Sequence, residues 1–261
     1  ILDNISLLRQ MNATVLRQNT ILFAPQQATR VRWNMNPDTP LPQEEPAGQN
    51  PPDGAIIDYY LAADATGVVT LEILDASGQV IRRYRSDDKP YALPADNTPP
   101  YWLRPQQILS GKKGAHRFLW DLHNDELDLP ISFPISAIYK NTAPESRSIW
   151  VMPGTYSVKL TVDGKSTTQP LKVRMDPRVR MTPTELQKQH DLSLQCYEGI
   201  KQCQAWMAAN MGNKEKLASV KRVHDNLART MNLLQEADMP VTSQMEKAVK
   251  ETVAQLAILK Q

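Results

Sequence analysis

The residues best suited to chemistry gather in one short stretch, HRFLWDLHND at 116–125, where two histidines and two aspartates precede Glu126. Imidazoles and carboxylates are common zinc ligands and the usual acids and bases of catalysis. The stretch could therefore form a metal site or a catalytic cluster. Alternatively, it is a strand that carries polar residues for structural reasons, and the function of the chain depends on which interpretation holds.

Alternating residue types in this stretch favour the strand. Two opposed faces result: His116, Phe118, Trp120 and Leu122 on one, and Arg117, Leu119, Asp121 and His123 on the other. At ~3.3 Å per residue, His116 and His123 would lie about 23 Å apart and could not share a metal ion. Only Asp121 and His123 have the i, i+2 spacing of a ligand pair. We predict a structural strand and keep a hydrolase that uses Asp121 and His123 as a third option.

Carboxylate pairs elsewhere make weak catalytic candidates. Glycoside hydrolysis needs two acids about 5–10 Å apart in a cleft. The pairs Glu44-Glu45, Asp87-Asp88 and Asp125-Glu126 are adjacent in predicted loops, where neighbouring side chains usually diverge into solvent. Asp58 and Asp121 lie in predicted strands, and we expect them to make structural hydrogen bonds.

Motifs for nucleophilic or phosphate chemistry are missing from the sequence. It has no G-x-S-x-G elbow and no glycine-rich phosphate loop. Two of its four histidines, His190 and His224, fall in predicted helices, where a structural role is the default. We therefore predict no catalytic residues, no metal site and no cofactor in this chain.

Aromatic residues in the long loops offer a different kind of site. Tyr101, Trp102, Tyr139 and Trp150 could stack on sugar rings, or they could pin proline-rich loops to a sheet or bury against a neighbouring domain. We favour the packing roles and keep carbohydrate binding as the alternative.

Composition excludes several classes of partner. The formal net charge is +2, with acidic and basic residues interspersed, so no nucleic-acid footprint is present. No apolar run approaches the ~18 residues that span a bilayer, so we expect no membrane span. The chain opens with ILDNISLLRQ, without Met, and we expect it to be part of a longer protein.

Cys196 and Cys203 lie seven residues apart in a predicted helix. This spacing separates their Cα atoms by about 10 Å, beyond the ~7 Å limit for a disulfide. It also matches no zinc motif. We expect two buried thiols.

The middle of the chain has the pattern of antiparallel strands. Ser77-Gly78 separates the apolar stretch at 67–75 from VIRRYR at 80–85, and Asp163-Gly164 separates the runs at 155–162 and 166–175. An Asp-Gly pair between alternating runs is a strong hairpin signal, because both turn residues need positive φ. Short strands without intervening helices indicate an antiparallel sandwich.

From residue 182 the periodicity becomes helical. Thr182-Pro183-Thr184-Glu185 supplies an N-cap, a proline at the first helical position and a glutamate at the third. Breaks at Met211-Gly212-Asn213 and at 237–240 divide the rest, and Ser243 with Glu246 opens the last helix. Three amphipathic helices with short links predict an antiparallel bundle.

The predicted fold class is therefore α+β and multidomain: an immunoglobulin-like antiparallel β-sandwich followed by an antiparallel three-helix bundle. Residues 1–45 form a proline-rich connector, residues 46–176 the sandwich and residues 182–261 the bundle.

Six phrases of the sequence, taken in order, resemble a known family. They are ILDNISLLRQ (1–10), LFAPQQATRVRW (22–33), NPPDGAIIDYYL (50–61), GAHRFLWDLHND (114–125), PGTYSVKLTVDGK (153–165) and MDPRVRMTPTELQKQ (175–189). Together they resemble the C-terminal region of large exported bacterial proteins with sortilin-like or BNR-repeat β-propellers, often described as glycosyl hydrolase-like.

This resemblance implies a setting for the chain. ILDNISLL would be the last strand of a propeller blade, so residues 1–45 would include a propeller remnant, and the upstream propeller would be the main partner. Location would be periplasmic or extracellular. The expected function is a non-catalytic accessory region that braces or orients the propeller, and the alternative is a carbohydrate-binding module of a glycoside hydrolase. Any hydrolase activity would reside in the parent protein.

Overall fold

The computed structural model describes residues 5–32, 44–46, 52–93, 99–133 and 140–259. These residues form two compact units. The sheet unit takes in the described parts of Ile1–Asp125, Pro130–Glu145 and Pro153–Asp176. The helical unit consists of Glu126–Leu129, Ser146–Met152 and the described part of Pro177–Gln261. The chain therefore crosses between the units several times.

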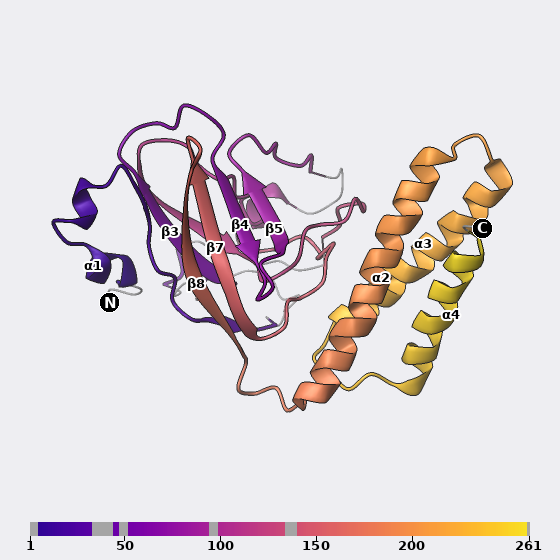
Figure 1. The fold of residues 1–261 in the computed structure, drawn as a ribbon. Helices are drawn as coiled ribbons and strands as arrows, with labels where there is room; N and C mark the ends of the chain where they lie inside the picture. The colour runs from indigo at the N-terminus through magenta and orange to yellow at the C-terminus, as the bar shows by residue number, and fades with distance from the viewer. Residues whose placement is uncertain (1–4, 33–43, 47–51, 94–98, 134–139, 260–261) are drawn as a thin grey trace. The chain divides into compact units, whose positions relative to one another are not determined.

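Two sheets build the sheet unit (Figure 1). The smaller has the order β1-β3-β6 and is antiparallel throughout. Its strands are β1 (Thr20–Leu22), β3 (Ala55–Leu61) and β6 (Gly114–Trp120). The larger has the order β2-β8-β7-β4-β5. Its strands are β2 (Ala28–Arg30), β4 (Thr70–Leu74), β5 (Val80–Arg85), β7 (Gly154–Val162) and β8 (Lys165–Met175).

Hairpins of the larger sheet form where their turn residues predict them. Asp163 and Gly164 have φ of 47° and 76°, which is the backbone that an Asp-Gly hairpin turn requires. The turn joins β7 to β8, with Val162 opposite Lys165. Alternate side chains of β7 are buried, from Tyr156 to Val162. The predicted hairpin around Gly78, which joins β4 to β5, is also confirmed.

Aromatic side chains join the two sheets. Trp120 at the end of β6 is fully buried and lies edge-on to Tyr156 of β7, with ring centroids 5.6 Å apart. Phe118 of β6 meets Tyr84 of β5 in the same way at 4.6 Å. Large buried rings of this kind contribute much of the apolar area that stabilises a core. They fix the end of β6, where the candidate residues lie.

The predicted immunoglobulin-like antiparallel sandwich is wrong. β2 pairs with β8 in parallel, so the larger sheet is mixed. In addition, β1 and β2 come from residues 20–30, which were predicted to belong to a connector. β1 extends the smaller sheet and β2 extends the larger one. The physical reason is that β3 and β8 each have an edge whose backbone groups need partners, and the N-terminal segment supplies them.

Residues near the start of the chain are helical and not extended. α1 spans Ser6–Gln10, so the blade strand expected over ILDNISLL is not formed at these residues. The Gln10 side chain bonds both backbone groups of Ala24, at 2.8 and 3.0 Å. Two 3₁₀ turns follow along the chain, η1 at Val15–Arg17 and η2 at Pro100–Trp102.

The helical unit contains α2 (Pro183–Ala209), α3 (Lys214–Gln235) and α4 (Ser243–Leu259). α2 begins with the predicted capping box, in which Thr182 and Glu185 bond each other's backbone amides. The cap of α4 is Thr242, one residue before the Ser243 that was predicted to open the helix. The Thr242 hydroxyl accepts the Met245 amide. Figure 1 shows the three helices in orange to yellow.

The prediction that a helical bundle simply follows the sheets is also wrong. Leu127 and Ile149 belong to the helical core, together with Cys196, Ile200 and Leu227. The Trp150 amide donates to Gln235 Oε1 at 2.8 Å, which ties residues 146–152 to α3. Segments from the middle of the chain therefore take part in the core of the helical unit.

Candidate functional site

Strand β6 carries residues 116–120 of the candidate stretch, so the strand predicted over 116–123 is confirmed only as far as Trp120. His116 Nε2 lies 2.6 Å from the Lys112 carbonyl, and its ring lies 5.0 Å from the ring of Tyr59. Arg117 forms a two-point ion pair with Asp58 of β3, at 2.8 and 3.0 Å. Both polar residues of this segment are therefore engaged in contacts that hold the sheet together.

The strand ends at Trp120, earlier than the alternation predicts. Leu122 adopts a φ of 61° and is 1% exposed, so the chain turns sharply while its apolar side chain stays in the core. This left-handed backbone is rare for leucine. The Trp120 indole then donates to the His123 carbonyl at 2.9 Å and closes the turn. As a result His123 does not continue a strand face.

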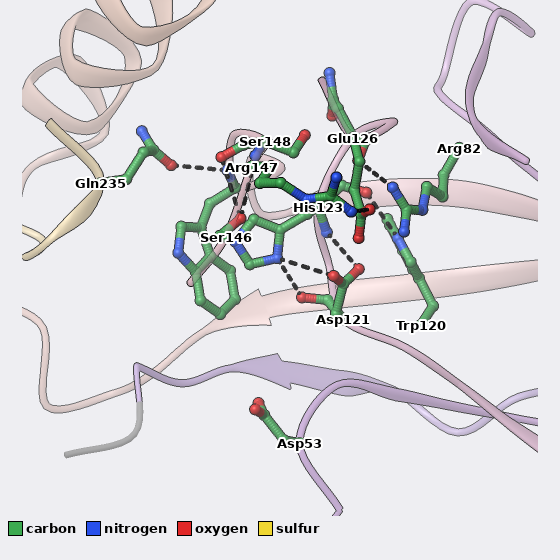
Figure 2. A network of polar contacts seen from close by, with 12 residues as sticks. Asp53, Arg82, Trp120, Asp121, His123, Glu126, Ser146, Arg147, Ser148 and Gln235 are labelled. Atoms are coloured by element: carbon green, nitrogen blue, oxygen red, sulfur yellow. Dashed lines mark hydrogen bonds and ion pairs between the residues drawn. The ribbon is translucent and has the colours of Figure 1, made fainter. Parts of the chain in front are cut away.

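His123 is buried in this turn, with 6% of its surface exposed. Its Nδ1 lies 2.7 Å from the Asp121 carbonyl and 3.6 Å from the Asp121 carboxylate. Figure 2 shows the imidazole directed toward Asp121. Because a carbonyl oxygen only accepts, Nδ1 donates and carries the proton of the neutral ring. The predicted i, i+2 pair thus forms, but mainly through the backbone of Asp121.

Burial lowers the pKa of His123 below its usual value of 6.5. The carboxylate and carbonyl of Asp121 act in the opposite direction, whereas the guanidinium groups of Arg32 and Arg82 add to the lowering. Nothing in the sequence indicates that two arginines from distant parts of the chain act on the charge of this ring. His123 is therefore neutral at pH 7.

The two histidines of the stretch have separate environments. His116 contacts the Lys112 carbonyl and His123 contacts Asp121. Within the described ranges, no group of three or more His, Cys, Asp or Glu side chains is arranged to hold a metal ion. Asp58 and Asp121 make structural hydrogen bonds, as expected: Asp58 pairs with Arg117, and Asp121 Oδ1 accepts the His123 amide.

Adjacent carboxylates also have structural partners. Asp87 makes a two-point ion pair with Arg85, and Asp88 accepts the Arg85 amide. Asp125 accepts the Arg83 amide, and Glu126 pairs with Arg147 (Figure 2). Glu44 and Glu45 are exposed.

The aromatic candidates within the described residues do not form a single surface on which a sugar could stack. Tyr101 is 57% exposed in η2, and Trp102 follows it with ring planes 76° apart. Trp150 is partly buried in the helical unit, and Tyr139 lies outside the described residues. The Trp102 Nε1 is buried and has no hydrogen-bond partner within the described part of the chain.

Two hollows between α2 and α4 were not anticipated from the sequence. One, of about 390 Å³, is lined by Gly199, Gln202, Val253, Leu256 and their neighbours. The other, of about 530 Å³, lies toward the start of both helices and shares Gln195 with the first. Gly199 is the one residue whose type could have drawn attention to this region, since a glycine inside a helix often marks a close approach of another element. A Cβ added at Gly199 would lie 2.8 Å from Leu227 Cδ1 of α3.

The remaining reactive residues of the helical unit serve the fold. Cys196 and Cys203 are free and buried, as predicted. His224 bonds Asp225 at 3.0 Å, and His190 lies 3.7 Å from Asp191.

Comparison with known protein families, curated proteins and solved structures finds no match. Among the described helices, none is both long and apolar enough to cross a membrane.

Proposed function

We propose that this chain is a non-catalytic accessory region of an exported β-propeller protein, in which it braces or orients the propeller. One observation carries the proposal. The polar side chains between 116 and 126 are committed to the fold, as the contacts of Arg117, His123 and Asp125 illustrate. A catalytic group instead needs a position from which it reaches a substrate.

The order in which the chain contributes segments to its two units also favours a bracing role. Segments 126–129 and 146–152 contribute to the helical core while the residues around them belong to the sheet unit. Each unit is therefore completed by segments that are distant in sequence. A bracing region benefits from such multiple crossings, because local opening of one segment leaves the others in place.

The resemblance of six sequence phrases to the tails of propeller proteins is the basis for the proposed partner and the proposed exported setting. The test uses the full-length reading frame, assayed for glycoside hydrolysis beside the present chain. We expect turnover, if any, in the full-length protein alone, and unchanged kcat per folded molecule in Asp121→Asn and His123→Asn variants of it. Turnover by the present chain, or a kcat that falls in these variants without loss of folding, would support the hydrolase option.

Carbohydrate binding is a second candidate because of the Tyr101–Trp102 pair. Tyr101 presents an exposed ring, and the ring of Trp102 lies next to it. Sugars are bound by ring stacking combined with polar contacts. A glycan array with the intact chain tests this candidate: a signal that disappears in Trp102→Ala and Tyr101→Ala, and persists in Tyr91→Ala, would establish it.

A further inference from the structure

Residues that follow the Leu122 turn cover the backbone edge of strand β5. β5 is the outermost strand of the larger sheet, so one row of its backbone groups faces away from β4. The Asp125 amide donates to the Ile81 carbonyl at 2.8 Å, and Asp125 Oδ1 accepts the Arg83 amide at 3.0 Å. The Asn124 carbonyl accepts the Arg82 guanidinium at 3.1 Å. We call residues 124–125 the β5 clasp.

The clasp depends on the buried turn before it. Leu122 combines a left-handed backbone with a buried side chain, and the Trp120 indole donates to the His123 carbonyl. The His123 ring adds the bond from Nδ1 to the Asp121 carbonyl. All of these contacts lie within the sheet unit. A change in the His123 ring therefore acts directly on the residues that cover β5.

The surroundings of the ring oppose a second proton. Among the described residues, the charged groups that act on it are Asp121 from its own turn, Arg32 from the segment after β2, and Arg82 from β5. The Asp121 side chain is 45% exposed, so water screens its attraction, whereas the His123 side chain is 7% exposed. An imidazolium here would be desolvated and would face two guanidinium groups.

We infer that the β5 clasp is acid-sensitive: protonation of His123 by solvent expels its ring from the turn, releases residues 121–125 and uncovers the edge of β5. The released edge presents the Ile81 carbonyl and the Arg83 amide. Unpaired groups of this kind are a template for an added strand. The device goes beyond the bracing role, because it makes one edge of the sheet available only in acid.

Hydrogen exchange of the Arg83 and Asp125 amides tests this inference. Exchange is measured between pH 7.5 and 5 and corrected for the intrinsic pH dependence of amide exchange. We expect protection to be constant above about pH 6.5 and to fall by up to about tenfold per pH unit below it, because opening then takes up one proton.

His123→Asn is the matched variant. Its amide group can still donate to the Asp121 carbonyl but does not titrate, so the fall in protection below pH 6.5 should disappear. Asp121 and Asp125 are the same in both proteins, so the difference between the two profiles reports His123. His116→Asn, on β6, should keep the wild-type profile. Identical profiles for wild type and His123→Asn, or a flat wild-type profile to pH 5, would overturn the inference.

A second measurement serves if His123→Asn does not fold. The ring of His123 is followed by NMR in the wild-type chain across the same pH range. We expect its titration midpoint below 6.5, coincident with loss of protection at Arg83. Titration at or above 6.5 with the Arg83 amide still protected would contradict the clasp mechanism.

Discussion

Arg117 and Asp58 form a two-point ion pair across strands β6 and β3, where they are direct neighbours in the register. The Asp58 side chain is 8% exposed and that of Arg117 is 42% exposed. The pair is therefore asymmetric: a buried carboxylate depends on a guanidinium that reaches it from the surface. It also explains why two charged residues are tolerated within these strands.

Arg117→Met should destabilise the sheet unit by about 1–3 kcal/mol, because it leaves the Asp58 carboxylate buried without its partner. Urea unfolding followed by tryptophan fluorescence measures the loss. Lys112→Met is the matched control: the side chains of Lys112 and Asp64 are 80% and 57% exposed, so solvent screens their ion pair and its loss should change stability very little. Equal effects of the two variants would show that the buried carboxylate does not need Arg117.

Gly54→Ala tests the close approach of β3 to the end of β6. Gly54 has a φ of 115°, and a Cβ there would lie 2.1 Å from the Trp120 carbonyl oxygen. Backbone cannot move aside as a flexible side chain can, so we expect a loss of at least about 3 kcal/mol.

Gly78→Ala is the control that separates the cost of backbone strain from the cost of steric overlap at Gly54. Gly78 also has positive φ, at 85°, but nothing lies within 4 Å of its added Cβ. It should lose only about 1 kcal/mol, the cost of alanine in this backbone region. A Gly54→Ala variant no less stable than Gly78→Ala would mean that the Trp120 turn can shift.

Features whose signals are local could be predicted from the sequence. The Asp163-Gly164 turn and the Thr182 capping box each depend on residues within a few positions of one another, and both are present. The same holds for the alternation that defines β6 as far as Trp120.

Features that depend on distant partners could not be predicted. β1 and β2 are only three residues long and exist because β3 and β8 have free edges. Leu122 shows a second limit of prediction from sequence, since leucine has no preference for the left-handed backbone that it adopts here. The alternation continues through His123 in the sequence, but the strand does not. The charged surroundings of the candidate histidine, Arg32 and Arg82, likewise come from tertiary structure alone.

Acid should weaken the helical unit through Glu246. Ion pairs with Lys188 and Lys250 lower the pKa of Glu246 to about 2. Because this folded-state pKa lies below the ordinary value of 4.5, the stabilisation is present above pH 4.5 and is lost as the pH falls toward 2. Glu246→Gln should therefore lower the Tm of the helical unit at pH 6 and have little effect near pH 2.

Glu251→Gln is the control for this prediction. Glu251 pairs with Lys247 at 3.7 Å on the same helix, with both side chains more than half exposed. Circular dichroism melts at pH 2, 4 and 6 should show little change in Tm at any pH for this variant. If Glu246→Gln shifts Tm equally at pH 2 and 6, the effect is not electrostatic.

The two cysteines should resist thiol reagents until the helical unit unfolds. Burial raises the pKa of the Cys196 thiol to about 12, and both cysteines are fully buried. The thiolate is the reactive form, so at pH 8 an aromatic disulfide reagent should label neither residue on the time scale of a free cysteine. In urea it should label two thiols per chain. Rapid labelling of the native chain would show that α2 opens locally at its centre, and Cys203→Ala would then identify which thiol is exposed.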